Sequence, residues 1–187
     1  MAEILACALE VAPVHRDPDP ASEQVTQALR GEPLLVRERR DGWARVVTAY
    51  DYPGWVREDA LEDGEGELPA DGAGSPVDVA RSYLGTRYQW GGLTEHGIDC
   101  SGLVHIAYRR LGRLVPRDAD QQEAAAAEVD ELRPGDLITY GDPADHIAFW
   151  LGDGRILHST GREDGIGVVE EPEPEELRAR RHKLVRL

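Results

Sequence analysis

Residues 97–111 read GIDCSGLVHIAYRRL, and the second half of this stretch has the period of a helix. Four side chains recur at i, i+3, i+4 and i+7: Val104, Ala107, Tyr108 and Leu111. Gly112 supplies a helix stop, so Cys100 stands at the start of the predicted helix. There the helix dipole favours a thiolate, and the cysteine's own N–H can point at a developing oxyanion. The alternative is that Cys100 is a small buried apolar residue.

Two histidines lie on consecutive predicted strands in the C-terminal half of the chain. His146 opens the first strand, residues 146–151, and His158 lies in the next, residues 155–159. A single histidine on a strand is usually structural. Two histidines on one face, together with a cysteine at a helix start, suit the nucleophile, base and orienting residue of a thiol hydrolase.

The turn between these strands decides whether the two imidazoles share a face. A two-residue loop, 153–154, would pair Phe149 with His158 and send the histidines to opposite faces. A three-residue loop that includes the preceding glycine would pair Ala148 with His158. His146 would then lie diagonally across from His158, within side-chain reach. The catalytic interpretation requires the three-residue loop.

The N-terminal and C-terminal parts of the chain differ in their secondary-structure patterns. Residues 1–63 contain short β-type runs separated by turn signals, which predicts a small all-β barrel. Residues 64–75, GEGELPADGAGS, are typical of a linker. Residues 76–187 mix helical and strand patterns and predict an α+β domain. Its expected helices begin at Ser75-Pro76, after Cys100 and over Asp120–Val129, and its expected strands are 137–140, 146–151, 155–159, 167–170 and 184–187.

Composition limits the classes of partner. The 21 basic and 36 acidic residues give a net charge of −15, which disfavours binding to nucleic acid or anionic lipid. Two cysteines without a CxxC pair cannot build a disulfide framework or a four-thiolate zinc site, and we expect no metal and no cofactor. The N-terminus lacks signal-peptide features, and no run approaches the ~18 apolar residues of a membrane helix, so we expect a cytoplasmic protein. The oligomeric state stays open.

Five segments occur in a fixed order between residues 76 and 187. They read YQWGG at 88–92, GIDCSGLV at 97–104, PRDA at 116–119, PGDL at 134–137, and His146 followed by LGDG at 151–154. This ordered set resembles the NlpC family of papain-like cell-wall cysteine peptidases. The N-terminal part resembles a bacterial SH3-like domain through GEP at 31–33, DGW at 41–43 and GWV at 54–56. The pairing is similar to the cytosolic members of the dipeptidyl-peptidase VI type, γ-D-glutamyl-L-diamino acid endopeptidases that trim recycled peptidoglycan peptides.

The resemblance implies a fold and a catalytic set. The fold would be an SH3-like β-barrel at 1–63, a linker at 64–75, and a papain-like α+β domain at 76–187 with helices packed on an antiparallel sheet. Cys100 would be the nucleophile, His146 the base and His158 the polar third member. Tyr88 would lie beside the nucleophile and assist the oxyanion site.

The resemblance also implies a substrate site. The substrate's free N-terminal amine and first peptide group would contact Asp99, Ser101 and Asp118. Ala119 stands where a serine is common. Walls from the SH3-like domain would come from Glu23 and Tyr52, with Tyr50 as the alternative to Tyr52. Trp90 either lines the groove or only packs against its neighbours.

The sequence therefore predicts a cysteine peptidase that acts on murein peptides. It would hydrolyse the γ-D-glutamyl bond to a diamino acid, diaminopimelate or lysine, in peptides with a free N-terminal L-Ala. One alternative is a non-catalytic muropeptide-binding module that uses the same groove. Another is an acyltransferase on the same scaffold, which would pass the acyl group to an amine instead of water.

Overall fold

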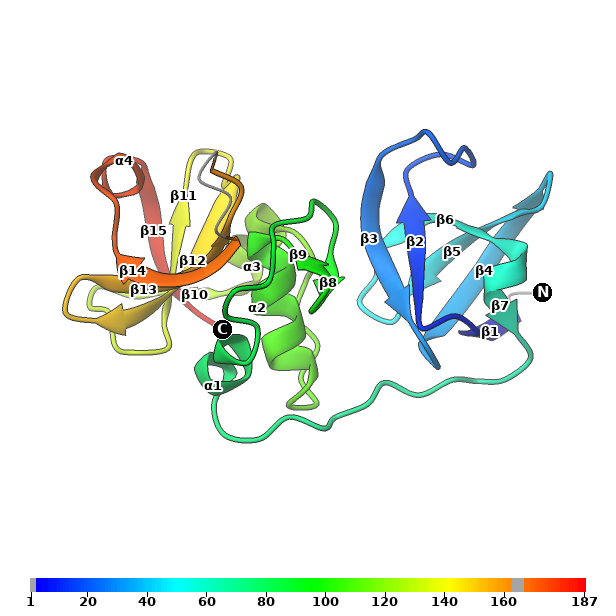
Figure 1. The fold of residues 1–187 in the computed structure, drawn as a ribbon, viewed down its shortest axis with the longest axis horizontal. Helices are drawn as coiled ribbons and strands as arrows, with labels where there is room; N and C mark the ends of the chain where they lie inside the picture. The colour runs from blue at the N-terminus through cyan, green and yellow to red at the C-terminus, as the bar shows by residue number, and fades with distance from the viewer. Residues whose placement is uncertain (1–2, 163–166) are drawn as a thin grey trace. The chain divides into compact units, whose positions relative to one another are not determined.

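The computed structural model describes residues 3–162 and 167–187, and the chain divides into two compact units, Met1–Pro69 and Ala70–Leu187 (Figure 1). The division lies inside the segment interpreted as a linker, although the bounds of the domains stay a prediction. The two units are described separately below.

The first unit is an antiparallel sheet curled around an apolar core. Its strands are ordered β3-β2-β6-β5-β4-β1-β7, with β1 Glu3–Cys7, β2 Val11–His15, β3 Gln24–Leu29, β4 Pro33–Arg40, β5 Trp43–Thr48, β6 Pro53–Arg57 and β7 Leu61–Glu62, and the 3-10 turn η1 Glu58–Ala60 precedes β7. Alternate residues of these strands, such as Val14, Leu34 and Val46, fill the interior. The all-β character predicted for this part is confirmed.

The second unit places helices against a six-stranded antiparallel sheet. The sheet order is β10-β15-β11-β12-β13-β14, with β10 Ala127–Glu128, β11 Leu137–Tyr140, β12 His146–Gly152, β13 Arg155–Thr160, β14 Gly167–Pro172 and β15 Arg181–Arg186. A second, two-stranded sheet joins β8 Leu93–Thr94 and β9 Gly97–Ile98. The helices are α1 Pro76–Arg81, α2 Cys100–Arg109, α3 Ala119–Ala125 and α4 Glu175–Arg178. This unit is α+β, as predicted.

Helix α2 is the central helix of the second unit. It packs against β12 and β13, and the ring of Tyr108 stacks on Phe149 with 6.4 Å between centroids. Its N-cap is Asp99, whose carboxylate accepts a hydrogen bond from the N–H of Gly102 at 2.6 Å. The predicted start at Cys100 is therefore confirmed, and the cap explains why the helix begins there.

Several predicted elements differ in extent from the observed ones; the strand expected at 167–170, for example, continues to Pro172 as β14. The helix expected over Asp120–Val129 is α3, Ala119–Ala125, which ends earlier. Residues 127–128 leave the helix to pair with the last strand as β10, so tertiary pairing outweighs the helical propensity of the alanine run. The last strand, expected at 184–187, starts earlier, at Arg181.

The β12–β13 hairpin has the register that places both histidines on one face, but it reaches this register through a bulge and not through a three-residue loop. The turn holds two residues, Asp153 and Gly154, both with positive φ, between the paired Gly152 and Arg155. A bulge between Trp150 and Gly152 then shifts the register by one residue. The expectation of a three-residue loop is wrong, because the extra residue is accommodated in the strand and not in the turn.

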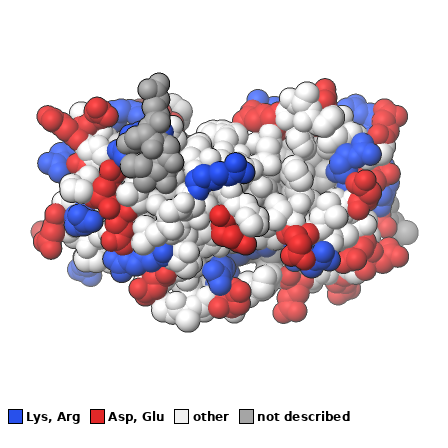
Figure 2. Space-filling model, viewed as in Figure 1, with Lys and Arg blue, Asp and Glu red and all other residues white. Residues whose placement is uncertain are grey.

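The charged residues on the face that Figure 2 shows do not gather by sign. Acidic and basic side chains are interspersed there, so the net negative charge is not gathered on that face into one patch. Within the described residues, no helix combines the length and the apolar character needed to cross a membrane.

Candidate active site

Cys100 is held against β12 at the first turn of α2. The side chain is buried, with 6% of its surface exposed. Its sulfur is hydrogen-bonded by the backbone N–H groups of Ile147 and Ser101. Ile147 directly follows His146 in the chain, so the sulfur and the imidazole arise from adjoining points of the structure. The helix start therefore presents the thiol to the first residues of β12.

His146 and His158 form a hydrogen-bonded pair. Nε2 of His146 lies 2.8 Å from Nδ1 of His158, and the two rings meet edge to face at an interplanar angle of 80°. The prediction that both imidazoles lie on one face of the sheet is confirmed. His158 is buried at 1% exposure, whereas His146 is half-buried. His158 thus supports His146 from behind, and His146 is the member of the pair that reaches a pocket.

Burial controls the protonation of these groups. Burial, followed by the negative charge of Asp99, raises the pKa of the Cys100 thiol to about 12. Burial and the neighbouring His158 lower the pKa of His146 to about 3. The free protein therefore holds a neutral thiol beside a neutral imidazole. The thiolate expected from the helix dipole is not the resting form, because desolvation outweighs the dipole and the hydrogen bonds to sulfur.

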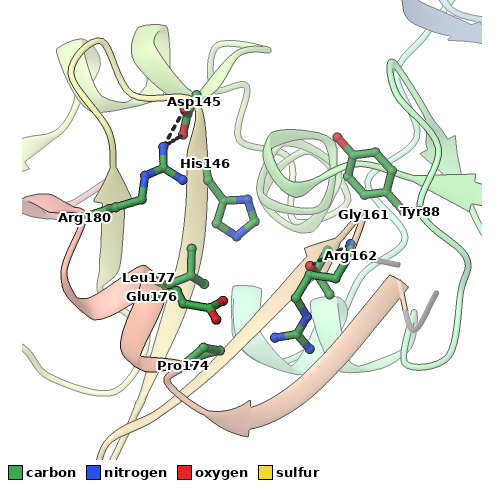
Figure 3. Close-up of a pocket in the computed structure, with 10 residues that line it drawn as sticks. Tyr88, Asp145, His146, Gly161, Arg162, Pro174, Glu176, Leu177 and Arg180 are labelled. Carbon is green, nitrogen blue, oxygen red and sulfur yellow. Dashed lines mark hydrogen bonds and ion pairs between the residues drawn. The ribbon is translucent and has the colours of Figure 1, made fainter. Parts of the chain in front are cut away.

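Tyr88 lies on the other side of a pocket of about 590 Å³ from His146 (Figure 3). A bridge pairs Tyr88 with Ile98, the residue directly before Asp99 and two residues before Cys100. Burial, the neighbouring Cys100 and the negative charge of Asp99 raise the pKa of Tyr88. Its hydroxyl therefore keeps its proton and is able to donate a hydrogen bond.

Asp99 and Ser101, expected at the substrate, belong to a buried network in this structure. Arg117 binds both carboxylate oxygens of Asp99, with Nη1–Oδ1 at 2.9 Å and Nη2–Oδ2 at 2.7 Å, and donates to Oγ of Ser101 at 3.0 Å. The N–H of Gly91 also donates to Asp99 at 2.7 Å. This network fixes the residues on both sides of Cys100. Contact of Asp99 or Ser101 with a substrate stays a prediction.

The remaining predicted contacts are distributed over both units. In the second unit, Asp118 is the half-buried N-cap of α3, and Trp90 is 59% exposed. In the first unit, the Glu23 carboxylate pairs with Arg16 at 2.5 Å, and Tyr52 is half-buried. Their roles in binding stay predictions.

Tyr50 and Tyr52, the two alternatives for one wall, differ in burial. The hydroxyl of Tyr50 is buried against Oγ1 of Thr26 at 3.2 Å. Tyr52 packs against Tyr50 and keeps part of its surface exposed. Exposure therefore favours Tyr52 as the residue that could meet a ligand.

Three residues of the site carried no assigned role in the sequence analysis. They are Arg117, Arg162 and Glu171. Arg117 was visible only as part of the PRDA segment, and Glu171 lies in a run of acidic residues. In the structure Glu171 accepts from Nε2 of His158 at 2.9 Å and pairs with Arg162. Only the strand alternation of residues 167–172 could have pointed to Glu171, because that alternation decides which carboxylates face His158.

Among residues 3–162 and 167–187, no group of three or more His, Cys, Asp or Glu side chains is placed to hold a metal ion. Cys7, the other thiol, is fully buried in the core of the first unit, and its sulfur contacts the carbonyl oxygen of Ala28 at 3.7 Å.

Comparison with known proteins finds relatives and solved structures similar to this chain. The gamma-D-glutamyl-L-lysine dipeptidyl-peptidase of Bacillus cereus is 28% identical over 134 residues, which cover 67% of this chain and 40% of that enzyme. The chain thus spans less than half the length of this relative. A crystal structure of an NlpC/P60 family protein from Bacillus cereus has a TM-score of 0.57 and 23% identity, covering 98% of this chain and 62% of that one. The peptidoglycan hydrolase RipB of Mycobacterium tuberculosis has a TM-score of 0.53 and 31% identity over 60% of this chain and 62% of that chain.

Family models divide the chain in the same way as the fold does. The bacterial dipeptidyl-peptidase Sh3 domain matches residues 14–61, within the first unit. The NlpC/P60 family matches residues 85–179, which hold Cys100, His146 and His158. This second match covers more than half of the 187 residues. The chain therefore belongs to the NlpC/P60 family and carries an SH3 domain of the bacterial dipeptidyl-peptidase type at its N-terminal end.

Proposed function

We propose that this protein is a cysteine peptidase that hydrolyses the γ-D-glutamyl bond to a diamino acid in peptides derived from peptidoglycan. The observation that carries the proposal is the meeting of three groups: a buried thiol at a helix start, His146 one residue from the backbone group that contacts the thiol, and His158 bonded to His146. A relative that matches 67% of this chain bears the name gamma-D-glutamyl-L-lysine dipeptidyl-peptidase, which describes cleavage of such a bond. A binding module alone has no need of such a set.

The proposed reaction follows from the protonation states. Because the resting thiol is neutral, His146 takes its proton as the sulfur of Cys100 attacks the glutamyl carbonyl carbon. Nε2 of His146 is engaged by His158, so Nδ1 is the acceptor. The backbone N–H of Cys100 at the start of α2, and the hydroxyl of Tyr88, would stabilise the oxyanion. His146 then gives the proton to the leaving amine, and water hydrolyses the thioester by the reverse sequence.

The pocket beside His146 suits a diamino acid as the leaving group. The imidazole must reach the leaving nitrogen, so the leaving residue occupies the His146 side of the sulfur. On that side, the imidazole and the exposed carboxylate of Glu176 both face the pocket, and Pro174 and Leu177 add apolar walls (Figure 3). Arg162 and Arg180 line the same pocket, so the pocket presents charges of both signs to the carboxylate and the side-chain ammonium of a diamino acid.

The opposite end of the substrate is proposed to be a free N-terminal amine. A desolvated ammonium needs a paired carboxylate, since otherwise its burial costs several kcal/mol. Asp99, Asp118 and Glu23 are the carboxylates proposed to contribute to holding the amine; Arg117 also binds Asp99, and Arg16 also binds Glu23. Tyr52, Ser101 and Trp90 are proposed as further contacts of the same peptide.

The test is mass spectrometry of L-Ala-γ-D-Glu-L-Lys and L-Ala-γ-D-Glu-meso-diaminopimelate after incubation with the protein. We expect release of the free diamino acid. N-acetylation should lower kcat/KM by roughly 30-fold or more, because loss of a buried charge pair costs about 2 kcal/mol or more. Asp118→Asn should reduce this discrimination, and the exposed neighbour Asp120 provides the matched control Asp120→Asn.

Other results would point to the alternatives. Equal rates on the free and N-acetylated peptides would refute the amine site but not the peptidase. Binding without turnover would indicate a non-catalytic module. An amide product formed in the presence of an added primary amine would indicate an acyltransferase.

A further inference from the structure

Behind His146 lies a chain of hydrogen bonds that ends at a carboxylate. Nδ1 of His158 is 2.8 Å from Nε2 of His146, and Nε2 of His158 is 2.9 Å from Oε1 of Glu171. Glu171 itself is held by Arg162, with Nη1–Oε1 at 2.9 Å and Nη2–Oε2 at 3.0 Å. All four side chains are at least half-buried. We name His146, His158 and Glu171 the imidazole–carboxylate chain.

Glu171 determines which nitrogen of His158 carries the proton. An ionised carboxylate only accepts hydrogen bonds, so the ring nitrogen that faces it must be the donor. Nε2 of His158 therefore bears the hydrogen, and Nδ1 of the neutral ring is bare. Burial favours the neutral form of His158, since it lowers the pKa of that ring against the opposing effect of Glu171.

The tautomer of His158 in turn determines the tautomer of His146, the proposed base. Bare Nδ1 of His158 can only accept, so Nε2 of His146 must donate. Neutral His146 then has its hydrogen on Nε2 and a free lone pair on Nδ1, which is the nitrogen required to take the proton of Cys100. The opposite tautomer of His158 would break the bond to Glu171, reverse the bond to His146 and place a hydrogen on Nδ1 of His146.

We propose that Glu171 is a positioning residue that fixes the tautomers of His158 and His146 and so keeps Nδ1 of His146 free to act as the base. Arg162 supports this role by binding both oxygens of Glu171. Burial alone would raise the pKa of Glu171, but the hydrogen bonds from Arg162 and His158 outweigh it, and the pKa lies below its usual range. When His146 is protonated during turnover, the carboxylate also stabilises the cation through His158.

The arrangement of β14 supplies a matched pair of variants. Glu171 faces His158, whereas the preceding Glu170 pairs with Arg81 at 2.5 Å. Glu171→Gln keeps the size and lets the amide either accept or donate, so it removes the tautomer bias. Glu171→Asp keeps an acceptor-only group. Glu170→Gln removes a carboxylate of the same strand that takes no part in the chain.

The direct readout is nitrogen-15 NMR of the histidine rings, which needs no substrate. The full-length protein and its Cys100→Ala form should show hydrogen on Nε2 of both His146 and His158, and Glu171→Gln should show a mixture of tautomers. In turnover, Glu171→Gln should lower kcat by about 10- to 100-fold with KM unchanged. Glu171→Asp should retain more of the rate, and Glu170→Gln should stay within about twofold of the parent.

The inference rests on the proposed function only because it takes Cys100 and His146 to act as a pair. The results that would overturn the inference therefore differ from those that would overturn the proposed function. Hydrogen on Nδ1 of His158 in the parent protein overturns the inference, even if Glu171→Gln fails to fold. Unchanged tautomers and unchanged kcat in Glu171→Gln overturn it as well. Lack of cleavage of the γ-D-glutamyl peptides refutes the proposed substrate and leaves the tautomer measurement valid.

Discussion

Single residues of this site owe their properties more to burial than to charge. Cys100 and His146 are both driven to their neutral forms because the surrounding protein cannot solvate an ion pair as water does. The pair is therefore suited to a transfer in which the proton leaves the thiol as the new bond forms. The N–H groups that contact the sulfur then stabilise the negative charge as it develops.

The two thiols of the chain should differ in their reactivity. Cys7 is completely buried in the core of the first unit and contacts backbone oxygens, whereas Cys100 has a residual exposed surface at the start of α2. Limited iodoacetamide at pH 7.5 should label Cys100 at least about tenfold faster than Cys7, as followed by peptide mass mapping. Faster labelling of Cys7 would contradict the assignment of the nucleophile.

At the scale of elements, the start of α2 depends on a buried ion pair. Arg117 is 1% exposed, binds the N-cap Asp99 at two points and also donates to the carbonyl oxygen of Gly92 at 3.3 Å. A single side chain thereby ties the loop before α2 to the helix that carries the nucleophile. The geometry of the site thus depends on a residue with no part in the chemistry.

Removal of this side chain should destabilise the second unit strongly. Arg117→Ala leaves the Asp99 carboxylate buried beside the helix start, and we expect a loss of about 3–5 kcal/mol in the free energy of unfolding measured by urea titration. Arg113→Ala is the matched control, because Arg113 is exposed and stacks on Tyr108, an interaction of about 1 kcal/mol or less. Equal losses for the two variants would show that the buried pair has no special structural role.

The sequence predicted where helices and strands lie better than it predicted how neighbouring strands are joined and paired. The capping residue before Cys100 and the helical period after it predicted α2, because both signals are local in the chain. The bulge that brings His146 and His158 together was missed, since two turn types were compatible with Gly152-Asp153-Gly154. Bulges depend on how neighbouring strands pack, which no local pattern encodes.

The residues behind the catalytic set were missed for a related reason. Glu171 meets His158 because two strands pair side by side, with Val169 opposite His158. Arg117 meets Asp99 across a sequence separation of 18 residues that includes the whole of α2. The sequence shows such charges but does not show which of them become neighbours, so only the resemblance of the PRDA segment drew attention to Arg117.

At the scale of the whole molecule, buried histidines link folding to pH. His105 and His146 of the second unit both have their pKa lowered to about 3, chiefly by burial, and that of His158 is lowered as well. Unfolded histidine titrates near ~6.5. Between these values the unfolded chain binds more protons than the folded one, so the free energy of unfolding must decrease as the pH falls from about 6.5 toward about 3.

Urea unfolding at pH 7.0 and pH 5.0 measures this linkage above the range in which most carboxylates titrate. Each histidine that is protonated in the unfolded chain but neutral in the folded one lowers the free energy of unfolding as the pH falls. The decrease is up to ~1.4 kcal/mol per pH unit between the unfolded and folded pKa values. His105→Gln should therefore reduce the difference between the two pH values, whereas His96→Gln, at an exposed loop position, should leave it unchanged. An undiminished difference in His105→Gln would contradict the link between burial of His105 and acid sensitivity.

The central claim is that Cys100 forms a covalent bond to the glutamyl carbonyl of a murein peptide. Mass spectrometry of protein that is acid-quenched within the first turnover of L-Ala-γ-D-Glu-diamino acid measures this bond directly. We predict an L-Ala-D-Glu acyl adduct on the peptide that contains Cys100, absent from Cys100→Ala and retained in Cys7→Ala, with free diamino acid released in equal amount. Cleavage that continues in Cys100→Ala, or an adduct on Cys7, would contradict the account.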